Sequence, residues 1–262
     1  MKVIDFHTHV YPDAIAVKAA ESIRVFYELE DHATMDGTVD TLLRKGRQLG
    51  VDKHVILPVA MKPDRTRNIN DFILDTLQDH EEFIGFGTLH AAMDNIAAEV
   101  EYIMHKGLRG IKMHPDFQLF NIDDERLFPA YDLLQGKLPV MFHMGDPRYD
   151  YSHPARLKHL MELFPRLQVI AAHFGGYRLH KEAADLLKDK DCFFDVSSSL
   201  MFMQPGEAEH YIDFYGAERF VYGSDYPLWD PVTEMERFLQ LKLSDDTREQ
   251  IFYKTAQTLL GI

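Results

Sequence analysis

The stretch Val3-Ile-Asp-Phe-His-Thr-His9 decides the fold. It is short and largely apolar, and it ends in two histidines, which predicts a buried strand with polar groups at its carboxyl end. A doubly wound open sheet would be expected to carry a glycine-rich turn after an early strand, and His-Thr-His stands there instead. The stretch therefore favours an α/β barrel, in which active-site groups come from the carboxyl ends of the strands.

Short apolar runs alternate with amphipathic stretches along the rest of the chain. The predicted strands are Val3–His7, His54–Val59, Phe83–Thr88, Leu108–Met113, Pro139–His143, Gln168–His173, Cys192–Val196 and Phe220–Gly223. The predicted helices are Thr38–Gln48, Asn70–Asp79, Asn95–Lys106, Glu125–Leu134, Ala155–Leu163, Lys181–Leu187, Val232–Leu241 and Asp245–Leu259. Eight strands alternating with helices predict a (β/α)₈ TIM barrel of the α/β class.

The length of the chain fits one such barrel. A plain barrel needs about 250 residues, so we expect residues 1–262 to form one domain. The connection Val10–Asp36 is longer than a usual barrel loop, and Asp13–Leu29 within it has helical spacing. We expect a small helical insertion after the first strand, which either caps the mouth of the barrel or packs as an extra surface helix.

The composition limits the partners. The formal net charge is −14 and no run of Lys and Arg stands out, so neither nucleic acid nor an anionic membrane surface is expected to bind. The one cysteine, Cys192, suits a reducing compartment. No signal peptide or transmembrane stretch is recognisable, so we expect a cytoplasmic protein. The expected partner is a small-molecule substrate, and a homodimer is compatible with the sequence.

Histidines gather at the predicted strand ends. His7 and His9 lie two residues apart, so both imidazoles face the same side of the first strand. Further polar groups follow later strands: His114, His143, His173 and Asp225. Imidazoles combined with a carboxylate form a site for a first-row divalent metal, so we expect zinc or another divalent ion, one per chain. His54 begins its strand, away from the chemistry, and is expected to be structural.

Five segments carry a resemblance to a known family. They are Ile4-Asp-Phe-His-Thr-His9, Gly110-Ile-Lys-Met-His-Pro115, Val140-Met-Phe-His143, Ile170-Ala-Ala-His-Phe-Gly-Gly176 and Tyr222-Gly-Ser-Asp-Tyr-Pro227. In this order they resemble the amidohydrolase superfamily, and more narrowly its amidohydrolase-related branch, which includes aminocarboxymuconate-semialdehyde decarboxylase. The resemblance implies that the metal, usually zinc, is bound by His7, His9, His143 and Asp225. It also implies that His173 is a neighbouring acid/base or an additional ligand.

Three functions remain open. The main one is hydrolysis of an amide, lactone or ester, in which the metal lowers the pKa of its bound water towards about 7. In that reaction Asp225 accepts the proton of the water and His173 passes it to the leaving group. The alternative is non-oxidative decarboxylation, because one metal centre can organise either a water or a carboxylate. A metal-binding protein without catalysis is a minor alternative, which the intact ligand set disfavours.

Lys112 has two interpretations. It lies two residues before His114 on the fourth strand, so the two share a face. Some superfamily members carry a carbamylated lysine at the end of this strand that bridges two metals, whereas the decarboxylase branch generally uses one metal. An unmodified Lys112 would instead bind a substrate carboxylate as a point charge. We expect Lys112 and His114 to contact the substrate.

Cations near the strand ends suggest an anionic substrate. Arg65, Arg67 and Arg148 follow predicted strands, as Lys112 ends one. An arginine can bind a carboxylate through two hydrogen bonds, so we expect Arg148 to bind a substrate that carries a carboxylate. The alternative is that these arginines pair with nearby aspartates such as Asp146.

Overall fold

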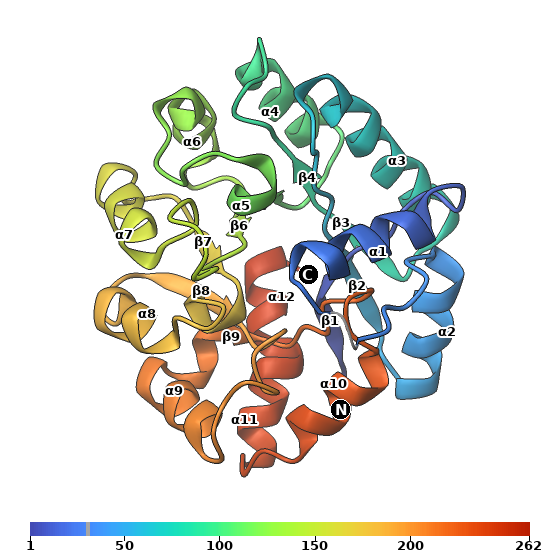
Figure 1. The fold of residues 1–262 in the computed structure, drawn as a ribbon, viewed down its shortest axis with the longest axis vertical. Helices are drawn as coiled ribbons and strands as arrows, with labels where there is room; N and C mark the ends of the chain where they lie inside the picture. Colours follow the sequence, from blue (N-terminus) through green and yellow to red (C-terminus); the bar gives the residue numbers. More distant parts are fainter. Residues whose placement is uncertain (30–31) are drawn as a thin grey trace.

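The computed structural model describes residues 1–29 and 32–262, and its centre is a set of parallel strands surrounded by helices (Figure 1). The strands are β1 (Ile4–Thr8), β2 (Lys53–Ile56), β3 (Phe83–Gly85), β4 (Gly87–Thr88), β5 (Ile111–Met113), β6 (Val140–Phe142), β7 (Val169–Ala171), β8 (Cys192–Asp195) and β9 (Phe220–Val221). Only Phe86 separates β3 from β4. The two are therefore halves of the third predicted strand, and the barrel has the eight strand positions expected.

Hydrogen bonds close the strands into a barrel. The strands pair in parallel in the orders β1-β2-β3 and β4-β5-β6-β7-β8-β9. The last strand meets the first through the Phe6 N–H, which donates to the Tyr222 carbonyl at 2.8 Å, and the Asp225 N–H, which donates to the His7 carbonyl at 2.8 Å. The predicted (β/α)₈ barrel is confirmed.

The helices are α1 (Ala16–Phe26), α2 (Val39–Leu49), α3 (Thr66–Asp79), α4 (Ile96–His105), α5 (Pro115–Gln118), α6 (Phe128–Leu134), α7 (Pro154–Leu163), α8 (His180–Leu187), α9 (Glu207–Tyr215), α10 (Pro231–Leu239), α11 (Asp245–Glu249) and α12 (Thr255–Leu260). The predicted helix Asp245–Leu259 is divided into α11, a π-helical turn over Gln250–Lys254, and α12. Helix α9 was not predicted, because its aromatic residues have modest helix propensity.

The barrel interior is apolar at one end and polar at the other. One buried cluster joins inward-facing residues of the strands to α12: Ile4, Phe6, Val55, Leu57, Phe86, Met141, Ile170, Ala172, Val221, Ala256, Leu259 and Leu260. Helix α12, in the middle of Figure 1, closes this end. A separate cluster packs the outward faces of the strands against the surrounding helices. Polar groups are thereby left to the inward positions at the carboxyl ends of the strands.

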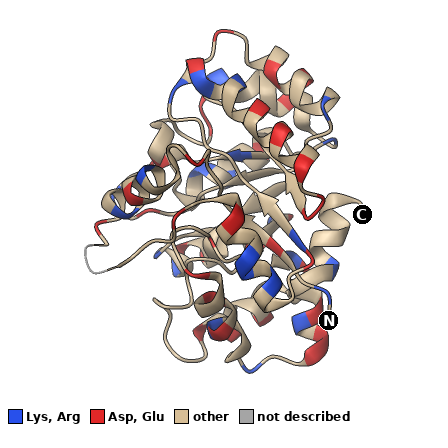
Figure 2. Ribbon diagram, turned by 90° about the vertical axis from the view of Figure 1, so that its right-hand side faces the viewer, with Lys and Arg blue, Asp and Glu red and all other residues tan. Residues whose placement is uncertain are grey.

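The predicted insertion is α1, drawn in blue across the barrel in Figure 1. Of its connection Val10–Asp36, residues 30 and 31 lie outside the described residues. Acidic and basic residues are interspersed over the outer helices in the view of Figure 2. Among the described residues, none of the helices has the length and hydrophobicity needed to cross a membrane.

Candidate active site

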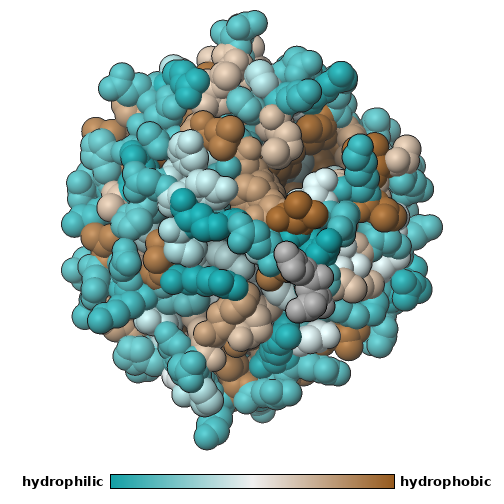
Figure 3. All heavy atoms as spheres, in the orientation of Figure 1, coloured by the Kyte–Doolittle hydropathy of each residue, from teal (hydrophilic) through white to brown (hydrophobic). Residues whose placement is uncertain are grey.

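A cavity of about 280 Å³ lies at the carboxyl ends of the strands, beneath α1. One wall is polar and consists of His7, His9, Lys112, His114, His143, His173 and Asp225. The rest of the lining, called the apolar wall below, is mainly apolar and consists of Tyr11, Ala19, Ser22, Ile23, Phe26, Tyr27, Val59, Met61, Phe117, Pro227 and Leu228. On the surface, apolar residues gather around a hollow beside α1 (Figure 3). The cavity can hold a small molecule with one polar and one apolar side.

A shift in strand register directs His7 into this cavity. In β1, Asp5 pairs with His54 but Thr8 pairs with Ile56, so β1 gains one residue on β2 between these two pairs. Such a bulge re-aims the side chains that follow it. Because of it, Ile4 and Phe6 join the apolar interior while His7 lines the cavity farther along the same strand.

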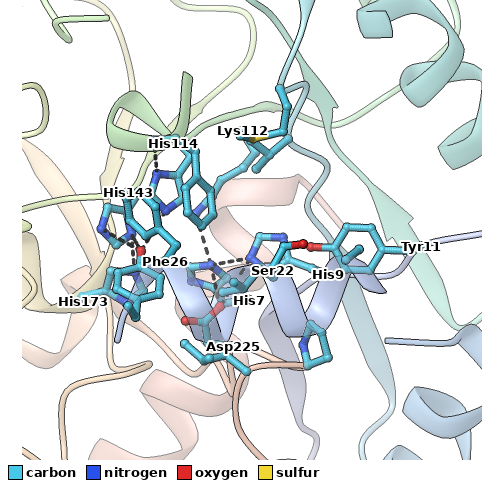
Figure 4. A pocket seen from close by; sticks show the side chains of 18 residues that line it. His7, His9, Tyr11, Ser22, Phe26, Lys112, His114, His143, His173 and Asp225 are labelled. Atoms are coloured by element: carbon cyan, nitrogen blue, oxygen red, sulfur yellow. Dashed lines mark hydrogen bonds and ion pairs between the residues drawn. The ribbon is translucent and has the colours of Figure 1, made fainter. Parts of the chain in front are cut away.

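The ligand atoms of three predicted metal-binding residues converge (Figure 4). The Nε2 atoms of His7 and His9 lie 3.2 Å apart, and Asp225 Oδ1 lies 3.4 Å from each of them. Ligand atoms bound to one ion at about 2.0–2.2 Å in a tetrahedral arrangement lie roughly 3.3 Å apart. The spacing therefore fits a shared divalent ion.

The Nδ1 atoms of His7 and His9, on the other side of each ring from Nε2, support the same conclusion. His7 Nδ1 lies 2.7 Å from Asp195 Oδ2, and His9 Nδ1 lies 2.5 Å from the Leu57 carbonyl oxygen. A carbonyl or carboxylate oxygen can only accept, so Nδ1 of each ring carries the proton and Nε2 presents its lone pair. This is the arrangement found where a histidine binds a metal and a neighbouring acceptor fixes its tautomer.

His173 lies closer to this group than His143 does. His7, His173 and Asp225 bring one ligand atom each within 4.8 Å of one another, whereas His143 forms a second such group with His114 and Asp116. His143 contacts a member of the first group, because the Nδ1 of His143 lies 3.0 Å from the Nε2 of His173. His173 Nδ1 faces the Ser197 carbonyl at 3.1 Å, so its Nε2 is also directed inward.

A family comparison identifies the chain. An amidohydrolase family model matches residues 4–262. The chain belongs to this amidohydrolase family. The predicted resemblance is thus confirmed, and the strand-end residues described above lie within the matched segment.

Solved structures share the fold of this chain. An uncharacterised TIM-barrel protein from Bordetella bronchiseptica is 19% identical with a TM-score of 0.82, over 100% of this chain and 99% of that one. The 5-carboxyvanillate decarboxylase of Sphingomonas paucimobilis is 15% identical with a TM-score of 0.77, over 100% and 99%. A dihydroxybenzoic acid decarboxylase from Polaromonas, with bound manganese, is 16% identical with a TM-score of 0.76, over 99% and 97%. A search of the curated proteins gave no match.

Lys112 belongs to the polar wall of the cavity. Its side chain is buried, and its Nζ lies 3.1 Å from His7 Nε2. Burial lowers the pKa of Lys112 to about 8, while the carboxylates of Asp195 and Asp225 oppose that shift. Lys112 thus places a cationic group directly beside the three converging ligand atoms.

Arg148 lies outside the cavity lining, unlike the other predicted substrate-binding residues. Its Nε and Nη2 donate to the two oxygens of buried Asp146 at 3.0 and 2.7 Å, and its Nη1 donates to the Phe26 carbonyl at 2.5 Å. Arg67 is likewise paired, with Glu99 at 2.7 Å. Among the predicted cations, Lys112 alone lines the cavity in the described part of the chain.

Sequence reasoning missed three residues of the site. Asp195, at the end of β8, orients His7. Ser198 donates a hydrogen bond to Asp225 Oδ2 and accepts one from Trp229 Nε1 at 2.8 Å. Tyr27, which caps the carboxyl end of α1, brings its hydroxyl 2.9 Å from His114 Nε2. A carboxylate ending a barrel strand is a signal that could have found Asp195.

The turns after the last strands are unusual in their backbone. His173, Ser198 and Asp225 have φ angles of 60°, 51° and 56°, in the left-handed region that residues other than glycine rarely adopt. Such conformations persist only where the surrounding structure imposes them, and they gather at functional sites. The absence of a side chain at Gly223 leaves room for His7, because a Cβ there would lie 2.6 Å from the Cβ of His7.

Proposed function

We propose that this member of the amidohydrolase family is a metal-dependent carboxy-lyase that removes a carboxyl group from a small aromatic acid. The observation that carries the proposal is the position of Lys112, whose Nζ lies 3.1 Å from His7 Nε2 in a cavity whose remaining lining is mainly apolar. A carboxylate would pair with this cation while the rest of the molecule contacts the apolar wall. The names of two structural relatives, which decarboxylate aromatic acids, support the same class of reaction.

The apolar wall favours a flat ring. Phe26 and Phe117 pack edge to face with their ring centroids 4.2 Å apart, and both line the cavity. Aromatic side chains prefer edge-to-face or offset contacts with other aromatic rings. A volume of about 280 Å³ suits a molecule with one ring.

The surroundings of Asp225 weigh against hydrolysis, which the sequence favoured. Its Oδ1 faces His7 and His9, and its Oδ2 accepts a hydrogen bond from Ser198. A carboxylate with one oxygen directed at the metal site and the other hydrogen-bonded is poorly placed to take a proton from a hydrolytic water. Decarboxylation has no need of such a base, so this arrangement supports the lyase.

The residues of the cavity have separate roles in the proposed decarboxylation. A bound divalent ion, zinc or manganese among the candidates, would bind substrate oxygens and withdraw electron density from the ring. Lys112 holds the carboxylate, and the apolar wall excludes water. The bond from the ring carbon to the carboxyl carbon breaks, carbon dioxide leaves, and the electron pair stays on the ring carbon. We assign the proton that this carbon then receives to His173 in its imidazolium form, because the neutral ring carries its one proton on Nδ1, toward the Ser197 carbonyl.

The test is an assay of the manganese-loaded and zinc-loaded protein. A panel of mono- and dihydroxybenzoates is incubated with each form, and carbon dioxide and the decarboxylated phenol are measured. Simple aryl esters, lactones and amides are assayed in parallel. Release of carbon dioxide from at least one benzoate supports the proposal. Turnover confined to the esters, lactones or amides would identify a hydrolase instead.

A further inference from the structure

Tyr27 brings a hydroxyl into the cavity from outside the barrel. It follows the last residue of α1, and its backbone N–H bonds to the Ile23 carbonyl at 3.0 Å. Its ring packs against Phe117 and Tyr177, with centroids 5.9 and 5.4 Å away. The hydroxyl therefore reaches the polar wall while its ring forms part of the apolar one.

His114 fixes the direction of this hydroxyl. The His114 ring lies between Phe117 and His143, with both centroids 3.9 Å away, and its Nδ1 accepts a hydrogen bond from the Phe117 N–H at 3.3 Å. Since Nδ1 accepts, the proton is on Nε2, and Nε2 donates to the Tyr27 oxygen at 2.9 Å. The Tyr27 O–H must then donate to another group.

His143 is a poor acceptor for that hydrogen. The Tyr27 oxygen lies 3.4 Å from Nδ1 and 3.3 Å from Nε2 of the His143 ring. The lone pairs of these two nitrogens diverge in the ring plane, so an atom equidistant from both lies on neither axis. The hydrogen of Tyr27 is thus available to a molecule in the cavity, and the donation from His114 makes it a stronger donor.

The carboxyl end of α1 is held in place by the ion pair of Arg148 with the buried Asp146. Arg148 donates to the Phe26 carbonyl, which belongs to the peptide that joins Phe26 to Tyr27. Its guanidinium lies over the rings of Phe26 and Tyr27, 4.7 and 5.6 Å from their centroids. Asp146, fully buried, fixes the guanidinium through two hydrogen bonds. The position of the Tyr27 hydroxyl is therefore set by the barrel and not by α1 alone.

We propose that Tyr27 is a substrate-binding residue whose hydroxyl donates a hydrogen bond to an anionic oxygen of the substrate. The proposal rests on the proposed function for the identity of the substrate. It does not depend on the reaction, because any carboxylate that enters the cavity would meet the same donor. Docking of α1 thereby completes the binding site.

The test compares Tyr27→Phe, which keeps the ring, with Tyr149→Phe, whose ring stacks on Phe26 at 5.8 Å outside the cavity lining. Dissociation constants for 2-hydroxybenzoate and for acetate are measured by calorimetry on the manganese-loaded proteins, together with metal content and thermal unfolding. One hydrogen bond to a charged oxygen predicts roughly tenfold weaker binding to Tyr27→Phe, unchanged metal content, and no change in Tyr149→Phe.

Each outcome decides the question. Equal dissociation constants for Tyr27→Phe and the unmodified protein would overturn the proposal, even if decarboxylation is observed. Weaker binding to Tyr27→Phe without any decarboxylation supports the role of Tyr27 and rejects the proposed reaction. If the unmodified protein binds neither anion, both proposals fail.

Discussion

Asp195 Oδ2 lies 2.7 Å from Nδ1 of His7, on the side of the ring opposite to Nε2. Both residues are buried, and burial alone would raise the pKa of Asp195, but the charge and hydrogen bond of His7 outweigh it and lower that pKa below its ordinary value. The carboxylate therefore stays ionised and keeps the His7 proton on Nδ1. This pair prepares Nε2 of His7 for a metal.

We predict that Asp195→Asn weakens metal binding by about 10- to 100-fold, because the amide no longer fixes the tautomer of His7. The affinity of the apoprotein for zinc and manganese is measured in competition with a chromophoric chelator. Asp191→Asn, exposed in the turn before β8, is the matched control and should bind metal normally. Normal affinity in Asp195→Asn would show that His7 needs no such partner.

Lys112→Met is predicted to strengthen metal binding, roughly tenfold, and to weaken benzoate binding. An ammonium group beside His7 Nε2 repels a divalent cation and attracts a carboxylate, so its removal affects the two in opposite directions. Metal affinity is measured by chelator competition, and benzoate and benzamide binding by calorimetry. Exposed Lys137→Met is the control. Loss of metal from Lys112→Met would instead indicate a carbamylated, metal-binding lysine.

Local regularities made part of the site predictable from the sequence. His7 and His9 share a face because strand side chains alternate, and Asp225 follows the last strand of the barrel. The contacts of 3.2 and 3.4 Å among them agree with that reasoning. The fold was predictable for the same reason, since eight apolar runs of strand length alternate with helical spacing.

Other features depend on contacts between distant segments. Asp195 lies in a predicted strand, but 188 residues separate it from His7, and alternation does not show which inward carboxylate meets which histidine. The position of α1 was left open because its spacing fits a cap and a surface helix equally. The contacts of Arg148 fix α1 over the cavity. The guanidinium, which the sequence suggested would bind the substrate, binds Asp146 and the Phe26 carbonyl at the end of α1.

The stability of the fold should depend on pH through His54. This ring lies on the outer face of β2 against Gly46, where a Cβ would come within 2.2 Å of its Nε2. Burial lowers the pKa of His54 from 6.5 to about 4, so the unfolded chain binds the proton more tightly than the folded protein does. Folding therefore loses stability as the pH falls from about 6.5 to about 4.

Over that range we predict that the unmodified protein loses up to about 3 kcal/mol more than His54→Leu, which has no group to protonate there. The free energy of unfolding is measured in urea at several pH values for both proteins. Other titrating groups are common to the two and cancel in the difference. Parallel curves would mean that the pKa of His54 is not lowered in the folded protein.

The last prediction separates two roles of Arg148, as a substrate clamp and as an anchor of α1. A clamp would bind a carboxylate directly, so Arg148→Met would weaken benzoate binding and leave neutral benzamide unaffected. In the structure its guanidinium is engaged by Asp146, the Phe26 carbonyl and Glu28, the last at 3.3 Å. We therefore predict that both molecules lose affinity by the same factor, roughly three- to tenfold, because α1 and Tyr27 are less well held.

Hydrogen exchange provides a second measurement for Arg148 that needs no ligand. Amides of α1 should exchange faster in Arg148→Met, whereas those of the barrel strands should not change, because the anchor acts on α1 through the Phe26 carbonyl. Exposed Arg166→Met is the control for loss of a positive charge. Unchanged exchange in α1, combined with a loss of affinity for benzoate alone, would restore Arg148 as a substrate-binding residue and remove it from the support of Tyr27.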